Sequence, residues 1–131
     1  IIKELSSLGF KLNITAVFTQ KHVDEILKLI NNKAQAIISI FSGRIADTGK
    51  NPAYLIKYAL KKTKKIKKID ILWASVREVY NYYEAKRMGC NIITLDKSIL
   101  NKFKLKNKNL HQYSKETSIQ FFKDGKKIKF I

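Results

Sequence analysis

The run AQAIISIF, residues 34–41, decides the fold class of this chain of 131 residues. Its apolar side chains are nearly continuous, which is typical of a parallel strand that is buried on both faces. A β-like run precedes it at residues 12–18, and residues 20–31 between the two carry an apolar stripe at helical spacing. Strand, helix and strand in this order predict a βα unit with parallel strands.

The same alternation continues on both sides of this unit. Further strands are expected at residues 69–75 and 91–95. The remaining helices are expected at residues 1–8, from Asn51 and Pro52 onward, and at residues 77–88, 97–103 and 115–123. Residues 42–50 are expected to form a loop. Because the chain opens on what reads as the tail of a helix ended by Gly9, we expect it to be a fragment of a longer protein.

Four βα units predict an α/β fold with a parallel sheet, and two architectures fit this pattern. One is an open, doubly wound sheet. The other is part of a (β/α)8 TIM barrel, which takes about 250 residues in full, so that this chain would supply about half of it. Periodicity does not choose between them, because both use the same alternation of strands and helices.

The net charge of +17 comes from 27 Lys and Arg residues against 10 Asp and Glu residues, and 24 of the 27 are Lys. These cations are spread evenly along the chain, whereas nucleic-acid readers usually gather Arg and aromatic side chains on one face. The densest run, residues 61–68, falls at the end of a helix, where cations suit the helix dipole. We therefore expect a lysine-rich surface and no nucleic-acid partner.

Other classes of site are excluded more directly. No apolar run approaches the roughly 20 residues of a membrane-spanning helix. Cys90 is the only cysteine, which excludes a disulfide framework and a cysteine-rich zinc site. His22 and His111 lack the spacing of metal ligands. We expect no metal, no cofactor, no membrane partner and a cytoplasmic location.

Polar side chains gather at the predicted carboxyl ends of the strands, where parallel α/β proteins bind ligands. They are Asn13, Thr15, Ser39, Ser42, Arg44, Ser75, Arg77, Thr94 and Asp96. Arg44 and Arg77 are two of only three arginines in the chain, and each follows a strand. A guanidinium at such a place favours bidentate recognition of phosphate or carboxylate. Alternatively, each arginine caps a loop or pairs with Asp47 or Glu78.

Three segments resemble the transaldolase family, which includes the small fructose-6-phosphate aldolase-like proteins. They are NITAVF at residues 13–18, ISIFSGRI at residues 38–45 and WASVR at residues 73–77. A fourth, GCNIITL at residues 89–95, resembles the last barrel strand of that family. The resemblance implies a (β/α)8 barrel, of which residues 1–131 would be the C-terminal half, strands five to eight with their helices, with the N-terminal half absent.

The resemblance also implies an enzyme of pentose phosphate metabolism that transfers or releases dihydroxyacetone from a ketose phosphate through a lysine Schiff base. The family's lysine lies on the strand just before Ile1, so we expect this chain alone to be inactive. Lys97, the one lysine on the catalytic side, is expected to be a surface residue. The expected partners are sugar phosphates; a homo-oligomer stays open. The alternatives are a non-catalytic sugar-phosphate-binding barrel and, less favoured, a basic nucleic-acid-binding α/β module.

Site roles follow from the resemblance, residue by residue. Thr15 would position the catalytic water, Asn13 would bind the three-carbon unit, and Ser39 would line the same pocket. The side chains that would hold the substrate phosphate are Arg44, Ser75 and Arg77. Phe41 is Phe in transaldolases and Tyr in the aldolase branch, which favours transfer over release, although one residue leaves the subfamily open.

Overall fold

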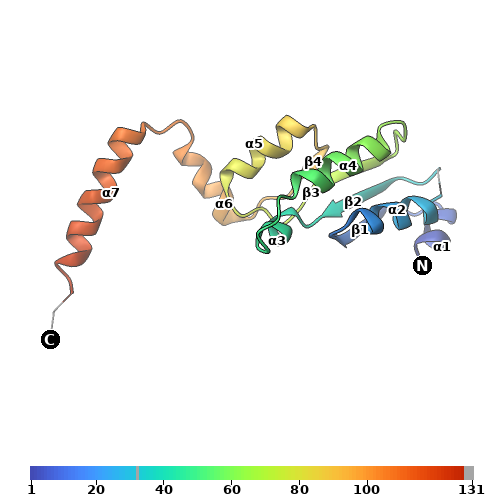
Figure 1. Cartoon of the computed structure of the whole chain (residues 1–131), viewed down its shortest axis with the longest axis horizontal. Coiled ribbons are helices and arrows are strands. Elements are labelled where there is room, and N and C mark those ends of the chain that lie inside the picture. Colours follow the sequence, from blue (N-terminus) through green and yellow to red (C-terminus); the bar gives the residue numbers. More distant parts are fainter. Residues whose placement is uncertain (32, 129–131) are drawn as a thin grey trace. The chain divides into compact units, whose positions relative to one another are not determined.

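Strands and helices alternate along the chain in the computed structural model, which describes residues 1–31 and 33–128 (Figure 1). The strands are β1 (Leu12–Val17), β2 (Ala36–Ile40), β3 (Ile69–Trp73) and β4 (Ile92–Ile93). The helices are α1 (Ile2–Ser7), α2 (Gln20–Leu29), α3 (Ser42–Ala46), α4 (Ala53–Thr63), α5 (Val79–Met88), α6 (Lys97–Lys102), the 3₁₀ turn η1 (Phe103–Leu105) and α7 (Leu110–Gly125). All four strands lie within the predicted ranges.

The four strands form one parallel sheet in the order β1-β2-β3-β4. Since strand order equals chain order, right-handed crossovers place the connecting helices on the same face. A doubly wound sheet reverses its strand order at a switch point and carries helices on both faces. Within the described residues the sheet is singly wound, which is consistent with part of a (β/α)8 barrel.

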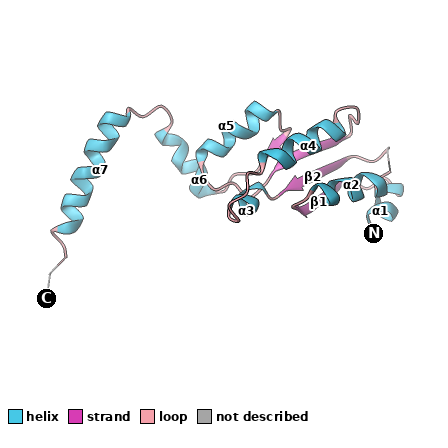
Figure 2. Ribbon diagram, in the orientation of Figure 1, coloured by secondary structure: helices cyan, strands magenta, loops and turns pink. Residues whose placement is uncertain are grey.

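The core lies on the face of the sheet that the helices cover. Ile38 pairs with Ile71 and Ile40 with Trp73 across β2 and β3, and each of these side chains is at most 1% exposed. Helix α4 contacts β3 and both neighbouring helices α2 and α5. Figure 2 shows α2 and α4 beside one another along the strands. Burial of these apolar groups is the main stabilising contribution to the fold.

The other face of the sheet is more polar. Asn13, Ile37 and Asp70 lie in register on β1, β2 and β3. Asn13 is exposed, and Ile37 and Asp70 are half-buried. In a closed barrel, the face opposite the helices points into the barrel interior, so this row would line the interior.

Residues 42–46 form helix α3, and the expectation of a loop there was wrong. The Ile45 N–H donates to the Phe41 carbonyl at 3.0 Å, and the Asp47 N–H donates to the Gly43 carbonyl at 2.9 Å. A helix of five residues is too short for an apolar period to reveal. These helical hydrogen bonds fix the backbone positions of Arg44 and Asp47.

Helix α7 begins at Leu110, whereas the sequence predicted a start at residue 115. The Oδ1 atom of Asn109 accepts a hydrogen bond from the Gln112 N–H at 3.0 Å and caps the helix. The sequence reading missed this cap because it assigned the whole Lys/Asn-rich segment to a loop. Whereas α7 is longer than predicted, β4 is shorter, with two residues instead of the five expected.

Strand β1 contains one extra residue relative to β2. Ile14 pairs with Ile38 and Val17 with Ile40, so three steps on β1 match two steps on β2. Ala16 has a φ of +57°, in the left-handed region that residues other than Gly rarely adopt. Thr15 therefore lies inside a β-bulge, which nothing in the sequence predicted.

By its contacts the chain divides into two units, Ile1–Asn101 and Lys102–Ile131. The first holds the sheet. The second holds η1 and α7, and no residue of α7 is buried. Among the described residues, no helix is long and apolar enough to cross a membrane. The assignment of residues 1–131 to one barrel domain stays a prediction.

Candidate functional site

The connections that follow β2 and β3 approach each other closely at Gly43. Its amide N–H donates to the Ala74 carbonyl at 3.4 Å. A Cβ atom at this position would lie 1.5 Å from the carbonyl oxygen of Ser75 and 3.1 Å from Cγ of Arg77. No side chain fits there, so glycine is required for α3 to pack against the segment that carries Ser75 and Arg77.

Ser75 adopts a φ of +62° and is half-buried. For a residue other than Gly such a conformation costs roughly 1 kcal/mol or more and persists only where the surroundings enforce it. The close contact at Gly43 is such a constraint. Strained backbone of this kind is concentrated at functional sites in proteins.

Arg77 forms an ion pair with Asp47, with 2.5 Å between Nη2 and Oδ2. Its backbone N–H also donates to Oδ1 of Asn81 at 3.1 Å. Both charged side chains are 52% exposed. Of the two alternatives for Arg77 weighed on the sequence, anion recognition or pairing with Asp47, the second is present in this structure, and the Arg77 side chain remains about half exposed.

Arg44 is held differently. Its guanidinium lies over the Phe41 ring, 5.7 Å from the ring centroid, in the arrangement of a cation–π contact. Phe41 packs in turn against Phe18, with 5.8 Å between ring centroids. No carboxylate of the described residues forms an ion pair with Arg44. Its charge is therefore not neutralised by a neighbouring side chain.

Asn13 and Ser39 meet across β1 and β2. The Ser39 hydroxyl donates to Oδ1 of Asn13 at 2.6 Å, and Ser39 is 2% exposed. Thr15 is exposed and lines a small cavity with Ile2 and Glu25 at the outer edge of β1. Among the described residues, Thr15 forms no hydrogen bond with Asn13 or Ser39.

Six of the seven predicted site residues form three local groups at neighbouring strands, and Thr15, the predicted catalytic residue, belongs to none of them. The groups are Asn13 with Ser39, Phe41 with Arg44, and Ser75 with Arg77 beside Gly43. The sequence identified these residue types but missed Gly43 and the bulge at Ala16. The need for glycine at position 43 is visible only in the folded structure, because its close neighbour Ser75 lies more than thirty positions away along the chain.

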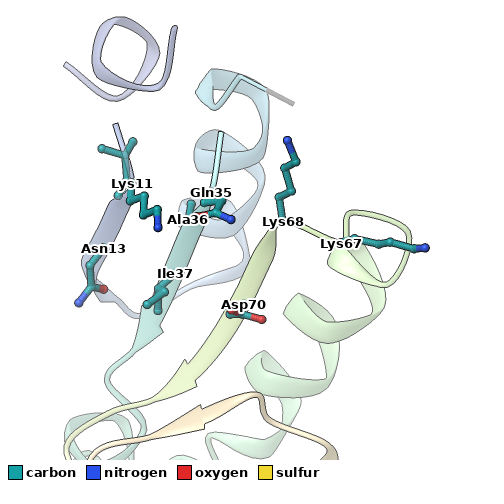
Figure 3. A pocket seen from close by; sticks show the side chains of 9 residues that line it. Lys11, Asn13, Gln35, Ala36, Ile37, Lys67, Lys68 and Asp70 are labelled. Atoms are coloured by element: carbon teal, nitrogen blue, oxygen red, sulfur yellow. The ribbon is translucent and has the colours of Figure 1, made fainter. Parts of the chain in front are cut away.

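Two concave regions lie at opposite ends of the strands. One, of about 400 Å³, is lined by Ser42, Gly43, Arg77, Asn81 and Glu84 among others, beside the arginine groups. The other, of about 370 Å³, lies at the amino ends and is lined by residues including Lys11, Asn13, Lys68 and Asp70 (Figure 3). The structure therefore places Asn13 near the amino end of β1, and the expectation that it lies at the carboxyl end was wrong. Parallel α/β proteins bind ligands at the carboxyl ends, so we take the arginine end as the candidate site.

The Cys90 thiol and the acidic side chains were also considered as metal ligands. No group of three or more His, Cys, Asp and Glu side chains in the part of the chain that the structure describes is placed to hold a metal ion. Burial raises the pKa of the Cys90 thiol to about 11, so the thiol is protonated at neutral pH and is a poor ligand or nucleophile. Lys97 is exposed, as expected.

The fold and these side chains are those of a parallel α/β protein, consistent with part of a (β/α)8 barrel, with cationic side chains at the carboxyl ends of its strands. The sequence model of the family "Transaldolase/Fructose-6-phosphate aldolase" matches residues 1–130. The chain belongs to this family, which confirms the resemblance drawn from residues 13–18, 38–45 and 73–77.

Curated relatives agree with this assignment. The chain is 32% identical over 130 residues to a probable transaldolase of Nitrosopumilus maritimus, covering 97% of this chain and 54% of that protein. It is 28% identical over 129 residues to a probable transaldolase of Carboxydothermus hydrogenoformans, covering 98% of this chain and 56% of that protein. The chain spans about half the length of the curated relatives it matches.

Proposed function

We propose that this chain is the C-terminal half of a transaldolase-type (β/α)8 barrel, strands five to eight with their helices. The intact enzyme would transfer or release dihydroxyacetone from a ketose phosphate of pentose phosphate metabolism through a lysine Schiff base. The observation that carries the proposal is the placement of Arg44, Ser75 and Arg77 beyond neighbouring parallel strands of a transaldolase-family chain. The lysine would lie on the strand preceding Ile1.

The chemistry explains why the residues of this half serve binding and proton transfer. A lysine amine adds to the ketose carbonyl and loses water, which gives an iminium ion. A base then takes the proton of the hydroxyl on the leaving carbon, the carbon–carbon bond breaks, and its electron pair passes to the iminium as an enamine. The aldose phosphate departs, and Thr15 would position the water that carries protons in these steps.

The pair Asn13 and Ser39 suits the three-carbon unit. Because Oδ1 of Asn13 accepts from Ser39 at 2.6 Å, its Nδ2 group remains available to donate to a hydroxyl or keto oxygen. No described residue accepts a hydrogen bond from that Nδ2 group. Ser39 thus fixes which end of the amide faces the substrate.

The phosphate would bind at the other two groups. Arg44 carries a charge that no carboxylate of the described residues neutralises, and Arg77 keeps donors free beside Asp47. Two guanidinium groups and the Ser75 hydroxyl provide the charge-assisted hydrogen bonds that a phosphate requires. Phe41 supports transfer to an aldose phosphate acceptor over simple release.

Reductive trapping tests this function. The complete protein, expressed from the full reading frame, is incubated with fructose 6-phosphate and borohydride, and the modified peptide is identified by mass spectrometry. We expect one adduct, on a lysine upstream of Ile1, and none when the 131-residue chain is treated alone. A variant with the trapped lysine changed to Met is the matched control. An adduct on Lys97 or any other lysine of this chain would refute the proposal.

A further inference from the structure

The ion pair between Asp47 and Arg77 joins the connections that follow two neighbouring strands. Asp47 directly follows α3 after β2, and Arg77 lies between β3 and α5. Their contact at 2.5 Å between Oδ2 and Nη2 lies beside the close approach of Gly43 to Ser75. Among the described residues, Arg77 pairs with a carboxylate in the candidate site and Arg44 does not.

The backbone is fixed at both ends of this pair. The Asp47 N–H donates to the Gly43 carbonyl at 2.9 Å. The Arg77 N–H donates to Oδ1 of Asn81 at 3.1 Å, and Asn81 Nδ2 donates to Glu84 at 3.0 Å. Because hydrogen bonds hold the backbone of both residues, the long Arg77 side chain is the part that can still move. The ion pair with Asp47 sets its direction.

A purely structural role explains the pair poorly. Both side chains are 52% exposed, and ion pairs as exposed as this contribute little to stability because water screens them and ordering two side chains costs entropy. Asp124 and Lys127 in α7 and the turn after it form a comparable exposed pair, with Asp124 also 52% exposed. That pair provides a matched reference for what an exposed aspartate contributes.

The geometry leaves the binding edge of Arg77 free. A guanidinium has five N–H donors on three nitrogens, and the hydrogen bond to Asp47 uses Nη2. Within the described residues, Nε and Nη1 make no hydrogen bond to protein. Nη2 has two N–H groups and Asp47 takes one of them, so one edge remains free, formed by the other Nη2 N–H with the N–H of Nε or of Nη1. Two adjacent N–H groups with a fixed direction are what bidentate recognition of a phosphate requires.

We propose that Asp47 is a positioning residue, whose carboxylate orients the Arg77 guanidinium so that its free edge meets the phosphate of the substrate. This inference rests on the proposed function. Asp47 has two opposing effects, since it orders Arg77 and also repels an incoming anion. We expect the first effect to dominate, because an arginine side chain that is free to rotate must be ordered when the phosphate binds, which costs affinity.

Steady-state kinetics of the complete protein with fructose 6-phosphate separate these effects. We expect Asp47→Ala to raise KM about tenfold with kcat changed less than about twofold, because the lost interaction acts on binding. Asp47→Asn keeps an oxygen acceptor and should restore KM to within about threefold of the wild-type value. Asp124→Ala, the matched control, should leave both constants unchanged.

A double-mutant cycle shows whether Asp47 acts through Arg77. Arg77→Ala alone should raise KM, and Asp47→Ala should add nothing in that background. If Arg77→Ala raises KM and Asp47→Ala does not, the positioning role is wrong and the proposed function stands. If Asp47→Ala has its full effect without Arg77, the role is also wrong. If neither variant changes KM, the phosphate site of the proposed function fails, and the inference fails with it.

Discussion

At the carboxyl ends of β2 and β3, each arginine is held by an identified partner, Arg77 by Asp47 and Arg44 by Phe41. At the amino ends of the same strands the cations are lysines, and the Lys67 side chain extends away from the sheet (Figure 3). Lys68 donates from Nζ to the backbone carbonyl of Lys33 at 3.0 Å and is exposed. The two arginines therefore contact side chains that direct them, whereas Lys68 reaches only a backbone carbonyl and Lys67 extends away from the sheet.

This difference shows why the net charge of +17 is a poor guide to the site. A lysine-rich surface attracts anions weakly and without a preferred geometry. Anion recognition needs donors whose direction is set before the ligand arrives, because ordering them on binding costs affinity. The variants below test this contrast between the two ends.

The largest effect is expected from Gly43→Ala. The new Cβ would lie 1.5 Å from the Ser75 carbonyl oxygen, so the backbone of one connection must move. We expect the free energy of unfolding to fall by about 3 kcal/mol, measured by urea titration, with loss of substrate binding. Gly125→Ala in α7 is the control, since nothing lies within 4 Å of a Cβ there; it should change stability by less than about 1 kcal/mol. Equal effects for both variants would contradict the close packing.

The next effect compares the two sets of cations directly. Arg77→Ala should raise KM for fructose 6-phosphate about 10- to 100-fold, because it removes charge-assisted hydrogen bonds to the phosphate. The double variant Lys67→Ala/Lys68→Ala removes two charges from the amino end and should change KM less than about twofold. Arg77→Lys keeps the charge without the planar fork and should lie between these values. A larger effect from the lysine pair would move the anion site to the other end of the sheet.

The smallest effect concerns Asp24 in α2, a carboxylate that pairs with Lys62 near the end of α4. Tyr58 donates to Asp24 at 2.8 Å, and Lys62 lies 3.2 Å from the same carboxylate. Chiefly the hydrogen bond from Tyr58, and then that from Lys62, lowers the pKa of Asp24 below its ordinary value.

Because the pKa of Asp24 is lower in the folded protein than in the unfolded chain, its contribution to stability is present above the unfolded value. That contribution is lost as the pH falls through the lowered folded value. We expect Asp24→Asn to reduce the acid sensitivity of unfolding below about pH 4, with little change in KM. Urea titrations at several pH values measure it, and Glu25→Gln, one position along α2, is the control. An unchanged pH profile for Asp24→Asn would show that the network adds nothing.

Much of the fold could be predicted from the sequence, because the apolar run at residues 34–41 and its neighbours report burial directly. Gly9 and Gly89 marked helix ends and have φ values of +83° and +79°. The strand order could not be predicted, since periodicity records which residues are buried and not which strands are neighbours.

Less of the site geometry could be predicted. The residue types at the strand ends identified the candidate residues but not the groups that they form, and helix α3 is too short to give a periodic signal. The positive φ at Ala16 and Ser75 depends on tertiary contacts that no local pattern encodes. Ordinary residues at these two positions gave no warning of strain, in contrast to the glycines.

The most direct test is the crystal structure of the complete protein in complex with fructose 6-phosphate, with the Schiff-base lysine changed to Met so that the phosphate-bearing product is not released. We expect phosphate oxygens at hydrogen-bond distance, about 3 Å, from the Arg44 and Arg77 guanidinium groups and the Ser75 hydroxyl, with Asp47 still contacting Arg77. A phosphate bound at the amino ends of the strands, beside Lys67 and Lys68, would contradict this expectation.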